Sequence, residues 1–341
     1  MDKTIPAGVR FLTLAPASTG FPAWRRCWWK ACRASDWDRG HALWAVPAGV
    51  GNAAPRVLYC HGGGFEDHRP QDTHCRAATA RLAAVSGMPV LAIDYRLVPE
   101  FRHPAQLEDA LQAFRWICEN GPDGPGAAPA VLLSGESSGG NLALALALRL
   151  RDERAPGAVT LAGISVVSPV TDLSCRGESY RTRRWRPGGG SKCDPLFRGP
   201  DAAAESMPQI HLLLGEPGRP GSFPATEPSI SPLHAELHGL PPTQIHVGDA
   251  EVLLSDSVDF GEKAAAAGSP VEVTVWPRMW HSFTLYSEGC GGPDAKPLRE
   301  AVEAIQQQGD FMRRVADQAA LRGSAGVTSG LPGPCEAGPS E

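Results

Sequence analysis

Residues 135–139 read Gly135-Glu136-Ser137-Ser138-Gly139, between an apolar run at residues 130–133 and an Ala/Leu-rich run at residues 141–148. This order predicts a strand, a tight turn and a helix. A serine on so sharp a turn leaves no room for Cβ atoms on its neighbours, which explains the two glycines. The dipole of the following helix favours negative charge near Ser137. Short motifs have many chance matches, so a catalytic serine and a plain Gly/Ser-rich turn both stay open.

A glycine-rich loop upstream favours the catalytic interpretation. His61-Gly62-Gly63-Gly64-Phe65 follows a second apolar run at residues 56–60. Adjacent glycines let the main chain approach a substrate closely, and their N–H groups can stabilise an oxyanion because they are fixed before the reaction. His61 abuts the strand end, so we expect it to brace the loop rather than act as a base. The two motifs together fit acyl transfer.

Composition narrows the class of protein. The chain has 341 residues, of which 42% are hydrophobic, enough for one large α/β domain. Its net charge of −5 gives no indication of a nucleic-acid or anionic-membrane partner. The N-terminus lacks an apolar signal core and no run approaches the roughly 18 residues of a membrane span, so we expect a cytoplasmic protein without an integral membrane segment.

The nine cysteines are an odd number and include no C-x-x-C pair, so we expect most to be reduced. A disulfide between Cys175 and Cys193 stays open.

Strand and helix signals alternate along the chain. Short aliphatic and β-branched runs predict strands at residues 56–60, 89–95, 130–135, 162–168, 243–248 and 271–276. Helices are expected at residues 72–86, 104–119, 139–153, 255–267 and 296–318. This alternation predicts an α/β fold with a mostly parallel central sheet and helices on both faces. Active groups should then gather at the carboxyl ends of the strands.

The expected organisation has three parts. Residues 1–50 form an N-terminal helical cap, because a Trp-rich segment there predicts an amphipathic helix. Packing of this helix on the core and capping of an apolar site mouth both stay open. The tryptophans of this segment are Trp24, Trp28, Trp29, Trp37 and Trp44. Residues 51–320 form the catalytic domain, in which the Gly-, Pro- and Arg-rich residues 174–230 are an irregular insertion or lid. Residues 321–341 are a Gly/Ser/Pro-rich tail that we expect to be disordered.

A serine nucleophile needs a base and an orienting acid, and hydrolases of this type carry them in the order serine, acid, histidine. His281 follows the last predicted strand and can reach over the sheet edge to the turn at Ser137. His246 lies inside a predicted strand and is interpreted as structural. His234 and His238 flank a Pro-rich turn, which predicts surface positions.

The acid should follow the strand at residues 243–248, where three carboxylates lie. Asp249 resembles a turn residue. Asp256 falls at an expected helix start, where an acid is favoured by the helix dipole. Local chemistry gives Glu251 only a slight preference, and Asp256 stays open beside it.

Further motifs accompany the serine and glycine stretches in a fixed order. They are His61-Gly62-Gly63-Gly64-Phe65, Asp94-Tyr95-Arg96-Leu97-Val98-Pro99-Glu100, His103-Pro104, Glu108-Asp109, Gly135-Glu136-Ser137-Ser138-Gly139-Gly140-Asn141, Ser168-Pro169-Val170-Thr171-Asp172, Gly239-Leu240-Pro241-Pro242, and Trp276-Pro277 followed by His281. On these motifs the chain resembles the hormone-sensitive-lipase-like family of α/β-hydrolases, which includes many carboxylesterases. The resemblance covers about residues 20 to 318.

The resemblance implies an α/β-hydrolase fold and a set of site residues. Glu251, two positions before Leu253, fits the acid position of the family, with Asp256 in reserve. The implied oxyanion donors are the backbone N–H groups of Gly63, Gly64 and Ser138. Asp94-Tyr95-Arg96 and His103-Pro104 are expected to support the site.

One departure from the family lies beside the oxyanion loop. His68 stands where many relatives have glycine, which changes the charge there. His68, Asp72 and His74 carry metal-ligating side chains, but their spacing matches no metal motif, so we assign no metal site.

The sequence therefore predicts a serine carboxylic-ester hydrolase acting through an acyl-enzyme on small to medium, apolar ester molecules. Ser137 is the nucleophile, His281 the base and Glu251 the acid, and the chemistry requires no metal or organic cofactor. A deacetylase, a lactone hydrolase and a non-catalytic small-molecule-binding protein on the same fold stay open as alternatives, although the presence of His281 argues against the last. Homodimer formation is also left open.

Overall fold

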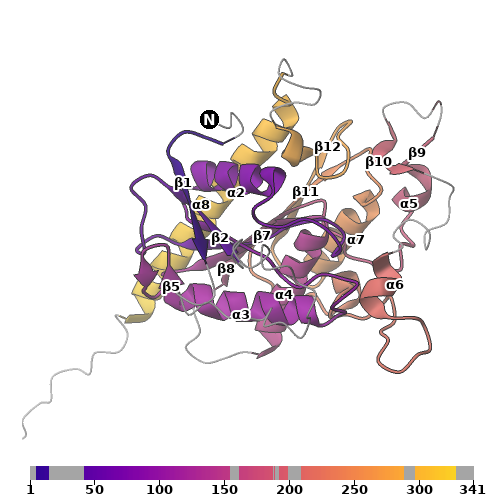
Figure 1. Ribbon diagram of the computed structural model, residues 1–341, viewed down its shortest axis with the longest axis horizontal. Coiled ribbons are helices and arrows are strands. Elements are labelled where there is room, and N and C mark those ends of the chain that lie inside the picture. Colours follow the sequence, from indigo (N-terminus) through magenta and orange to yellow (C-terminus); the bar gives the residue numbers. More distant parts are fainter. Residues whose placement is uncertain are drawn as a thin grey trace, which may run out of the picture.

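The computed structural model of the chain describes residues 5–14, 42–153, 161–186, 188, 192–198, 209–287 and 296–327. Its centre is an eight-stranded sheet in the order β1-β2-β4-β3-β7-β8-β11-β12 (Figure 1). Six of these strands pair in parallel: β3 (Arg56–Cys60), β4 (Val90–Ile93), β7 (Val131–Glu136), β8 (Leu161–Val167), β11 (Thr243–Gly248) and β12 (Val271–Trp276). The predicted mostly parallel sheet is confirmed.

Strand register brings the site loops to one edge of this sheet. Cys60 pairs with Gly135 across β3 and β7, and Glu136 pairs with Val167 across β7 and β8. Farther along, Gly248 pairs with Trp276 across β11 and β12. The segments that follow β3, β7, β8, β11 and β12 therefore leave the sheet at the same level, where ligands bind in open α/β sheets.

The first two strands were not predicted. β1 (Val9–Leu14) and β2 (Ala42–Pro47) form an antiparallel pair, and β2 joins β4 in antiparallel register. Trp44 lies in β2 with its side chain wholly buried and its ring 6.5 Å from that of Trp116. The expectation that Trp44 belongs to a helical cap is therefore wrong, because its side chain fills the sheet core. The other four tryptophans of the predicted cap lie outside the described residues.

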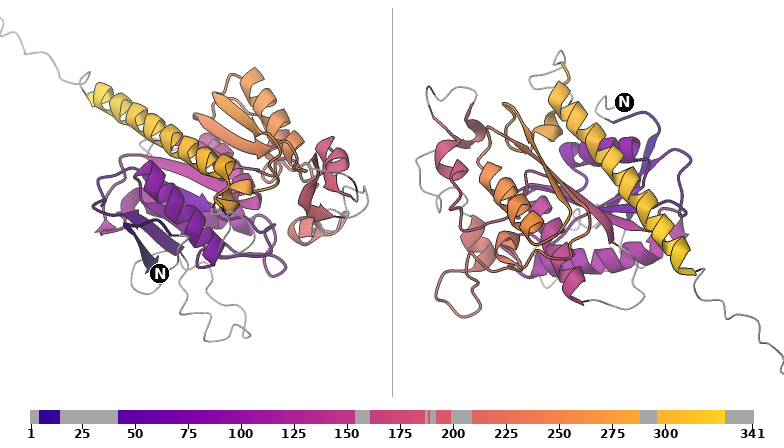
Figure 2. Two further views of the ribbon diagram at one scale, coloured as in Figure 1. Left: turned by 90° about the horizontal axis from the view of Figure 1, so that it is seen from above. Right: turned by 180° about the vertical axis from the view of Figure 1, so that it is seen from behind.

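Helices cover both faces of the sheet. α2 (Thr73–Ser86) and α8 (Arg299–Val327) pack on one face, where Val57, Leu132 and Ala162 join Met312 in a buried cluster. α3 (Ala105–Glu119), α4 (Ser138–Glu153) and α7 (Leu254–Ala266) pack on the other face around a larger cluster. The right-hand view of Figure 2 shows α8 crossing the molecule diagonally. The two apolar layers hold the sheet edge, and with it the site loops, in a fixed position.

The last helix is longer than predicted. α8 continues to Val327, so residues 321–327 are helical where a disordered tail was expected. Residues 328–341 lie outside the described part of the chain. Across the described residues, no helix is both long and apolar enough to cross a membrane.

Short elements occupy much of the predicted insertion at residues 174–230. They are α5 (Ser179–Thr182), β9 (Arg184–Trp185), β10 (Asp194–Arg198) and α6 (Gln209–Leu214). These elements lie together at one side of the molecule in Figure 1. Cys175 and Cys193 are both buried free thiols, so the disulfide left open above is not formed.

The remaining described elements are small. β5 (Asn120–Gly121) pairs with β6 (Gly124–Pro125) after α3. There are two 3-10 turns. η4 (Pro232–His234) precedes β11, and η5 (Phe283–Tyr286) follows β12. η5 begins two residues after His281 and so helps to fix the loop that carries this histidine.

Candidate active site

Ser137 sits on a sharp turn between β7 and α4. Its φ of +55° lies in the left-handed region, which costs a non-glycine residue on the order of 1–2 kcal/mol. A Cβ atom on Gly139 would overlap the carbonyl oxygens of Cys60 and His61, and one on Gly135 would overlap that of Cys60. The turn thus requires both glycines because the backbone of β3 approaches it closely, and the strained serine is exposed toward the site.

Ser137, His281 and Glu251 form one hydrogen-bonded chain. His281 Nε2 lies 2.9 Å from Ser137 Oγ, and His281 Nδ1 lies 2.9 Å from Glu251 Oε2. Glu251 is wholly buried just after β11, and His281 is 7% exposed in the loop after β12. The three residues come from the carboxyl ends of three different strands. The structure thus brings together the predicted nucleophile, base and acid.

The other carboxylates considered for the acid have different partners. Asp256 lies in the first turn of α7, where its Oδ2 accepts the backbone N–H groups of Thr171 at 2.6 Å and Asp172 at 2.9 Å. Asp249 Oδ1 accepts the backbone N–H of Arg278 at 2.5 Å, as expected of a turn residue. Glu251, and not Asp256, is therefore the carboxylate that hydrogen-bonds the imidazole of His281.

The predictions for the other histidines agree with the structure. His246 is wholly buried in β11, where its Nδ1 accepts the indole N–H of Trp276 at 3.0 Å. His234 and His238 are exposed.

Glu251 is held by groups other than the histidine. The backbone N–H of Gly248 and the hydroxyl of Ser168 donate to its Oε1 at 2.5 and 3.0 Å. Ser168 Oγ in turn accepts the backbone N–H of Ser282 at 3.0 Å. This network fixes the carboxylate and the histidine loop together. Sequence reasoning placed Ser168 in a family motif at the end of the strand predicted at residues 162–168 but did not assign it this role.

Asp194 supports the histidine from the predicted insertion. It lies in β10, is wholly buried, and its Oδ2 accepts the backbone N–H groups of His281 at 3.3 Å and Val252 at 3.4 Å. Asp194 therefore links the loop that follows β11 to the loop that follows β12. Nothing in the local sequence singled it out, because both partners are remote in the chain.

The carboxylates around His281 change its acidity. Burial on its own lowers the pKa of the imidazole, but the hydrogen bond and charge of Glu251, with further charge from Asp194 and Glu136, outweigh burial and raise that pKa above its ordinary 6.5. A more basic imidazole is better suited to accept a proton from a serine hydroxyl.

The glycine loop forms one wall of the site. Gly63 and Gly64 both have positive φ, at +107° and +65°, and both line the site pocket. Ser138 begins α4 immediately behind Ser137, and its hydroxyl accepts the backbone N–H of Phe65 at 3.3 Å. The structure thus gathers Gly63, Gly64 and Ser138 around Ser137, while their role as oxyanion donors stays a prediction.

His61 braces this loop, as expected from its position. Its ring stacks on that of Tyr95 with centroids 4.4 Å apart, and its Nδ1 lies 2.7 Å from the carbonyl of Gly62. The hydroxyl of Tyr95 donates to the carbonyl oxygen of His61 at 2.6 Å.

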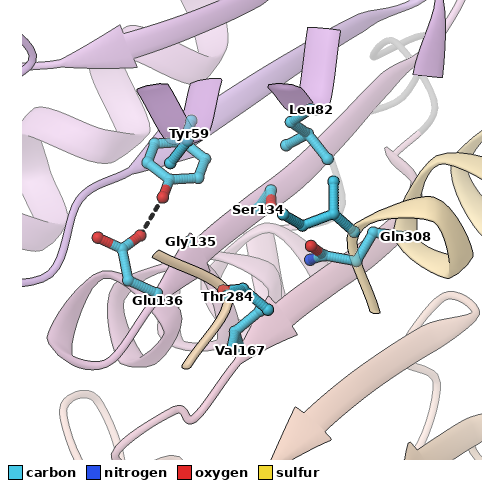
Figure 3. A pocket seen from close by; sticks show the side chains of 10 residues that line it. Tyr59, Leu82, Ser134, Gly135, Glu136, Val167, Thr284 and Gln308 are labelled. Atoms are coloured by element: carbon cyan, nitrogen blue, oxygen red, sulfur yellow. Dashed lines mark hydrogen bonds between the residues drawn. The ribbon is translucent and has the colours of Figure 1, made fainter. Parts of the chain in front are cut away.

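Glu136 anchors the glycine loop from behind. Its Oε1 accepts the backbone N–H of Gly62 at 2.8 Å, and its Oε2 accepts the hydroxyl of Tyr59. Figure 3 shows this pair at one end of a small internal pocket, with Gln308 of α8 at the other. Burial raises the pKa of Glu136 to about 7. Sequence reasoning treated Glu136 only as a variable position of the serine motif and missed this function.

The site opens into a pocket of about 350 Å³, within the range of small-molecule sites. Its apolar lining comes from three parts of the chain: Val170, Leu196, Phe197, Leu285 and Tyr286. The ring of Phe197 packs edge-on against His281, with centroids 5.3 Å apart. Residues of the predicted insertion therefore contribute both a wall of the pocket and a contact with the histidine.

Comparison with known proteins agrees with this geometry. Residues 57–285 match a family model described as the alpha/beta hydrolase fold. The chain belongs to the α/β-hydrolase family. This hydrolase is 35% identical to an acetyl-hydrolase of Streptomyces hygroscopicus over 277 residues, which is 80% of each chain.

Two further relatives place it within that family. It is 35% identical over 271 residues to the carboxylesterase/phospholipase LipF of Mycobacterium tuberculosis, covering 78% of this chain and 63% of LipF. A crystal structure of an esterase from the bacterial hormone-sensitive lipase family superposes with a TM-score of 0.67 at 29% identity, covering 93% of this hydrolase and 86% of that chain. The resemblance to the hormone-sensitive-lipase-like family is therefore confirmed.

Asp256→Asn should flatten the pH dependence of folding stability. Burial raises the pKa of Asp256 from 3.8 to about 7, although the N–H groups of Asp172 and Thr171 oppose the rise. The pKa of Asp256 is higher in the folded protein than in the unfolded chain, so the protonated carboxyl stabilises the folded state. This contribution is fully present below about pH 4 and is lost as the pH rises to about 7. The loss is on the order of 4 kcal/mol, since one pKa unit corresponds to about 1.4 kcal/mol.

Asparagine keeps an acceptor for both N–H groups but cannot ionise. Urea unfolding of both proteins at several pH values should therefore show the wild type losing stability relative to the variant between about pH 4 and pH 7. A stability difference that does not change with pH would contradict a raised pKa at Asp256.

Glu136→Ala should disturb the glycine loop, because the N–H of Gly62 loses its buried acceptor. We expect kcat/KM for an aryl acetate to fall by about 10- to 100-fold, in the range seen when oxyanion donors are misplaced. Glu136→Gln keeps an acceptor toward Gly62 and should stay within a few-fold of the wild type. Circular dichroism controls for folding, and equal activity of the two variants would show that the loop does not depend on this anchor.

Proposed function

We propose that this α/β-hydrolase cleaves small to medium, apolar carboxylic esters through an acyl-enzyme on Ser137. The observation that carries the proposal is the chain from Ser137 Oγ through His281 to Glu251, with both hydrogen bonds 2.9 Å long. It faces a pocket large enough for a small ester. The names of the relatives, an acetyl-hydrolase and a carboxylesterase/phospholipase, support the same reaction class.

In the acylation step Ser137 Oγ attacks the ester carbonyl carbon and passes its proton to His281 Nε2. Glu251 accepts the Nδ1–H of the same ring, which fixes the tautomer and stabilises the imidazolium. The N–H groups of Gly63, Gly64 and Ser138 receive the negative charge on the carbonyl oxygen. The intermediate then collapses, and the alcohol leaves with the proton from His281.

Deacylation repeats these steps with water. His281 takes a proton from the water molecule as it attacks the acyl carbon, and then returns a proton to Ser137 Oγ as the carboxylic acid leaves. Each proton transfer uses the same imidazole, and the sequence of steps requires no metal or organic cofactor.

The lining of the pocket supports small apolar ester substrates. Val170, Phe197 and Leu285 offer apolar surface around Ser137, and about 350 Å³ limits the group that fits. Deacetylation and lactone opening use the same triad and remain alternatives. The non-catalytic binding alternative is disfavoured, because His281 is in hydrogen-bond contact with Ser137. A cytoplasmic location stays a prediction from the sequence, and homodimer formation stays open.

Loss of the nucleophile should abolish turnover. Wild-type protein should label with a fluorophosphonate probe and hydrolyse p-nitrophenyl acetate, whereas Ser137→Ala should lose labelling and at least about 10³-fold in kcat. Glu251→Gln should lose a similar factor because the wrong tautomer of His281 is favoured. Asp256→Asn is the matched control and should stay within about tenfold of the wild type, because its carboxyl contacts residues 171–172. A severe loss in Asp256→Asn with a silent Glu251→Gln would refute the acid assignment.

The pH dependence of turnover should follow the protonation of the His281 imidazole. Since the base must be neutral, kcat/KM should rise with pH through the pKa of this histidine, with a midpoint above 6.5. Glu251→Gln removes the main group that raises this pKa, so its residual activity should have a lower midpoint. Steady-state kinetics across the pH range test this, and an unchanged midpoint in the variant would contradict the coupling between Glu251 and His281.

A further inference from the structure

Three metal-ligating side chains converge beside the glycine loop. His68 lies at the end of that loop, Asp72 directly precedes α2, and His74 lies in its first turn. One ligand atom from each lies within 4.8 Å of the other two. His68 Nδ1 is 3.9 Å from Asp72 Oδ2, and the rings of His68 and His74 meet edge to face with centroids 4.1 Å apart.

We propose that His68, Asp72 and His74 bind a divalent transition-metal cation, with Zn²⁺ as the best match. Two imidazoles and one carboxylate form a ligand set typical of zinc, and a water molecule would complete a tetrahedron. Imidazole nitrogen favours zinc and its neighbours in the first transition row over Mg²⁺ and Ca²⁺, which prefer oxygen-only sites. The sequence spacing had argued against a metal site, but the turn between His68 and α2 brings the ligands together.

The ligand atoms of His68, Asp72 and His74 can coordinate one cation after a small movement toward one another. Bonds of about 2.0–2.1 Å around tetrahedral zinc place neighbouring ligand atoms about 3.3 Å apart. The ligand atoms must approach one another by up to about 1.5 Å. The side chains of His68 and Asp72 are 39% and 43% exposed, so both can change rotamer to do so. Their exposure also gives a cation direct access from solvent.

The Nε2 atom of His74 is available as a metal ligand. It is buried and has no hydrogen-bond partner among the described residues. Asp72 is placed by a separate contact, because its Oδ2 accepts the backbone N–H of Arg69 at 2.8 Å.

A cation here would link the glycine loop to α2. The carbonyl of Gly63 accepts the N–H groups of Glu66 and Asp67, so the loop closes directly before His68. A Cβ atom on Gly63 would lie 2.8 Å from Cδ2 of His68, which shows how closely this ring packs on the loop. Holding His68 against Asp72 and His74 would therefore restrain the backbone of Gly63. The proposal does not require Ser137 to be a nucleophile.

The test is zinc binding by the full-length, metal-free protein. Isothermal titration with ZnCl2 should give one saturable site per chain, and bound Zn²⁺ should raise the melting temperature. Co²⁺ in place of Zn²⁺ should give the visible absorption of a four-coordinate site. Asp72→Asn and His74→Ala should each weaken Zn²⁺ binding by at least about tenfold, since even outer-shell changes at metal sites cost that much. His238→Ala, which removes an exposed histidine elsewhere, is the matched control and should bind normally.

Two results would overturn the metal site. One is the absence of saturable binding, and the other is equal Zn²⁺ affinity in the wild type, Asp72→Asn and His74→Ala, which would place the cation at His281 or on the surface. Asp72 is partly exposed, so its variant should fold even if His74→Ala does not. Fluorophosphonate labelling of the same preparation reports on Ser137 separately. Labelled protein without zinc binding refutes only the metal site, and zinc binding without labelling refutes only the proposed hydrolase.

Discussion

The close approach of the turn at Ser137 to the end of β3 is the constraint on which the rest of the site depends. Gly139 lies where any side chain would overlap the carbonyls of Cys60 and His61. This contact brings the turn at Ser137 against the strand that leads into the glycine loop. Without it, Gly63 and Gly64 would not share a pocket with Ser137. One steric requirement on two glycines therefore sets the distance between two motifs that are far apart in sequence.

Two buried glutamates hold the glycine loop and the imidazole of His281 in place. Glu136 accepts the N–H of Gly62 and so orients the loop, whereas Glu251 accepts from His281, Gly248 and Ser168 and so orients the imidazole. A buried carboxylate is costly unless its oxygens are hydrogen-bonded. Backbone N–H groups supply part of that bonding in both cases, which ties each acid to the position of its own loop.

Most strands of the parallel sheet could be predicted from local sequence. Buried parallel strands are short aliphatic runs, which can be recognised without knowing which strands they pair with. Local sequence failed at β1 and β2, where Trp44 was interpreted as part of a helical cap and instead fills the core beside Trp116. The placement of Ser137 and His281 at strand ends, within hydrogen-bond distance of each other, was predictable from the motifs, and their roles as nucleophile and base stay predictions. The choice between Glu251 and Asp256 was not settled by local chemistry, because both are acids after the same strand and only the three-dimensional path shows which one reaches His281. Asp194 could not be predicted, because its contact with His281 joins residues 87 positions apart.

The predicted insertion contributes both to the wall of the site pocket and to the position of His281. β10 supplies Asp194, which holds the backbone of His281, and Leu196 and Phe197, which line the pocket. Phe197 also packs against the imidazole. A substitution that reshapes this wall therefore displaces a strand that also positions His281. If His281 is the base, changes in substrate preference and in turnover should arise together. Val170 and Leu285 line the same pocket from other segments, and so offer places where the fit to the acyl group can change while β10 keeps its contacts with the histidine.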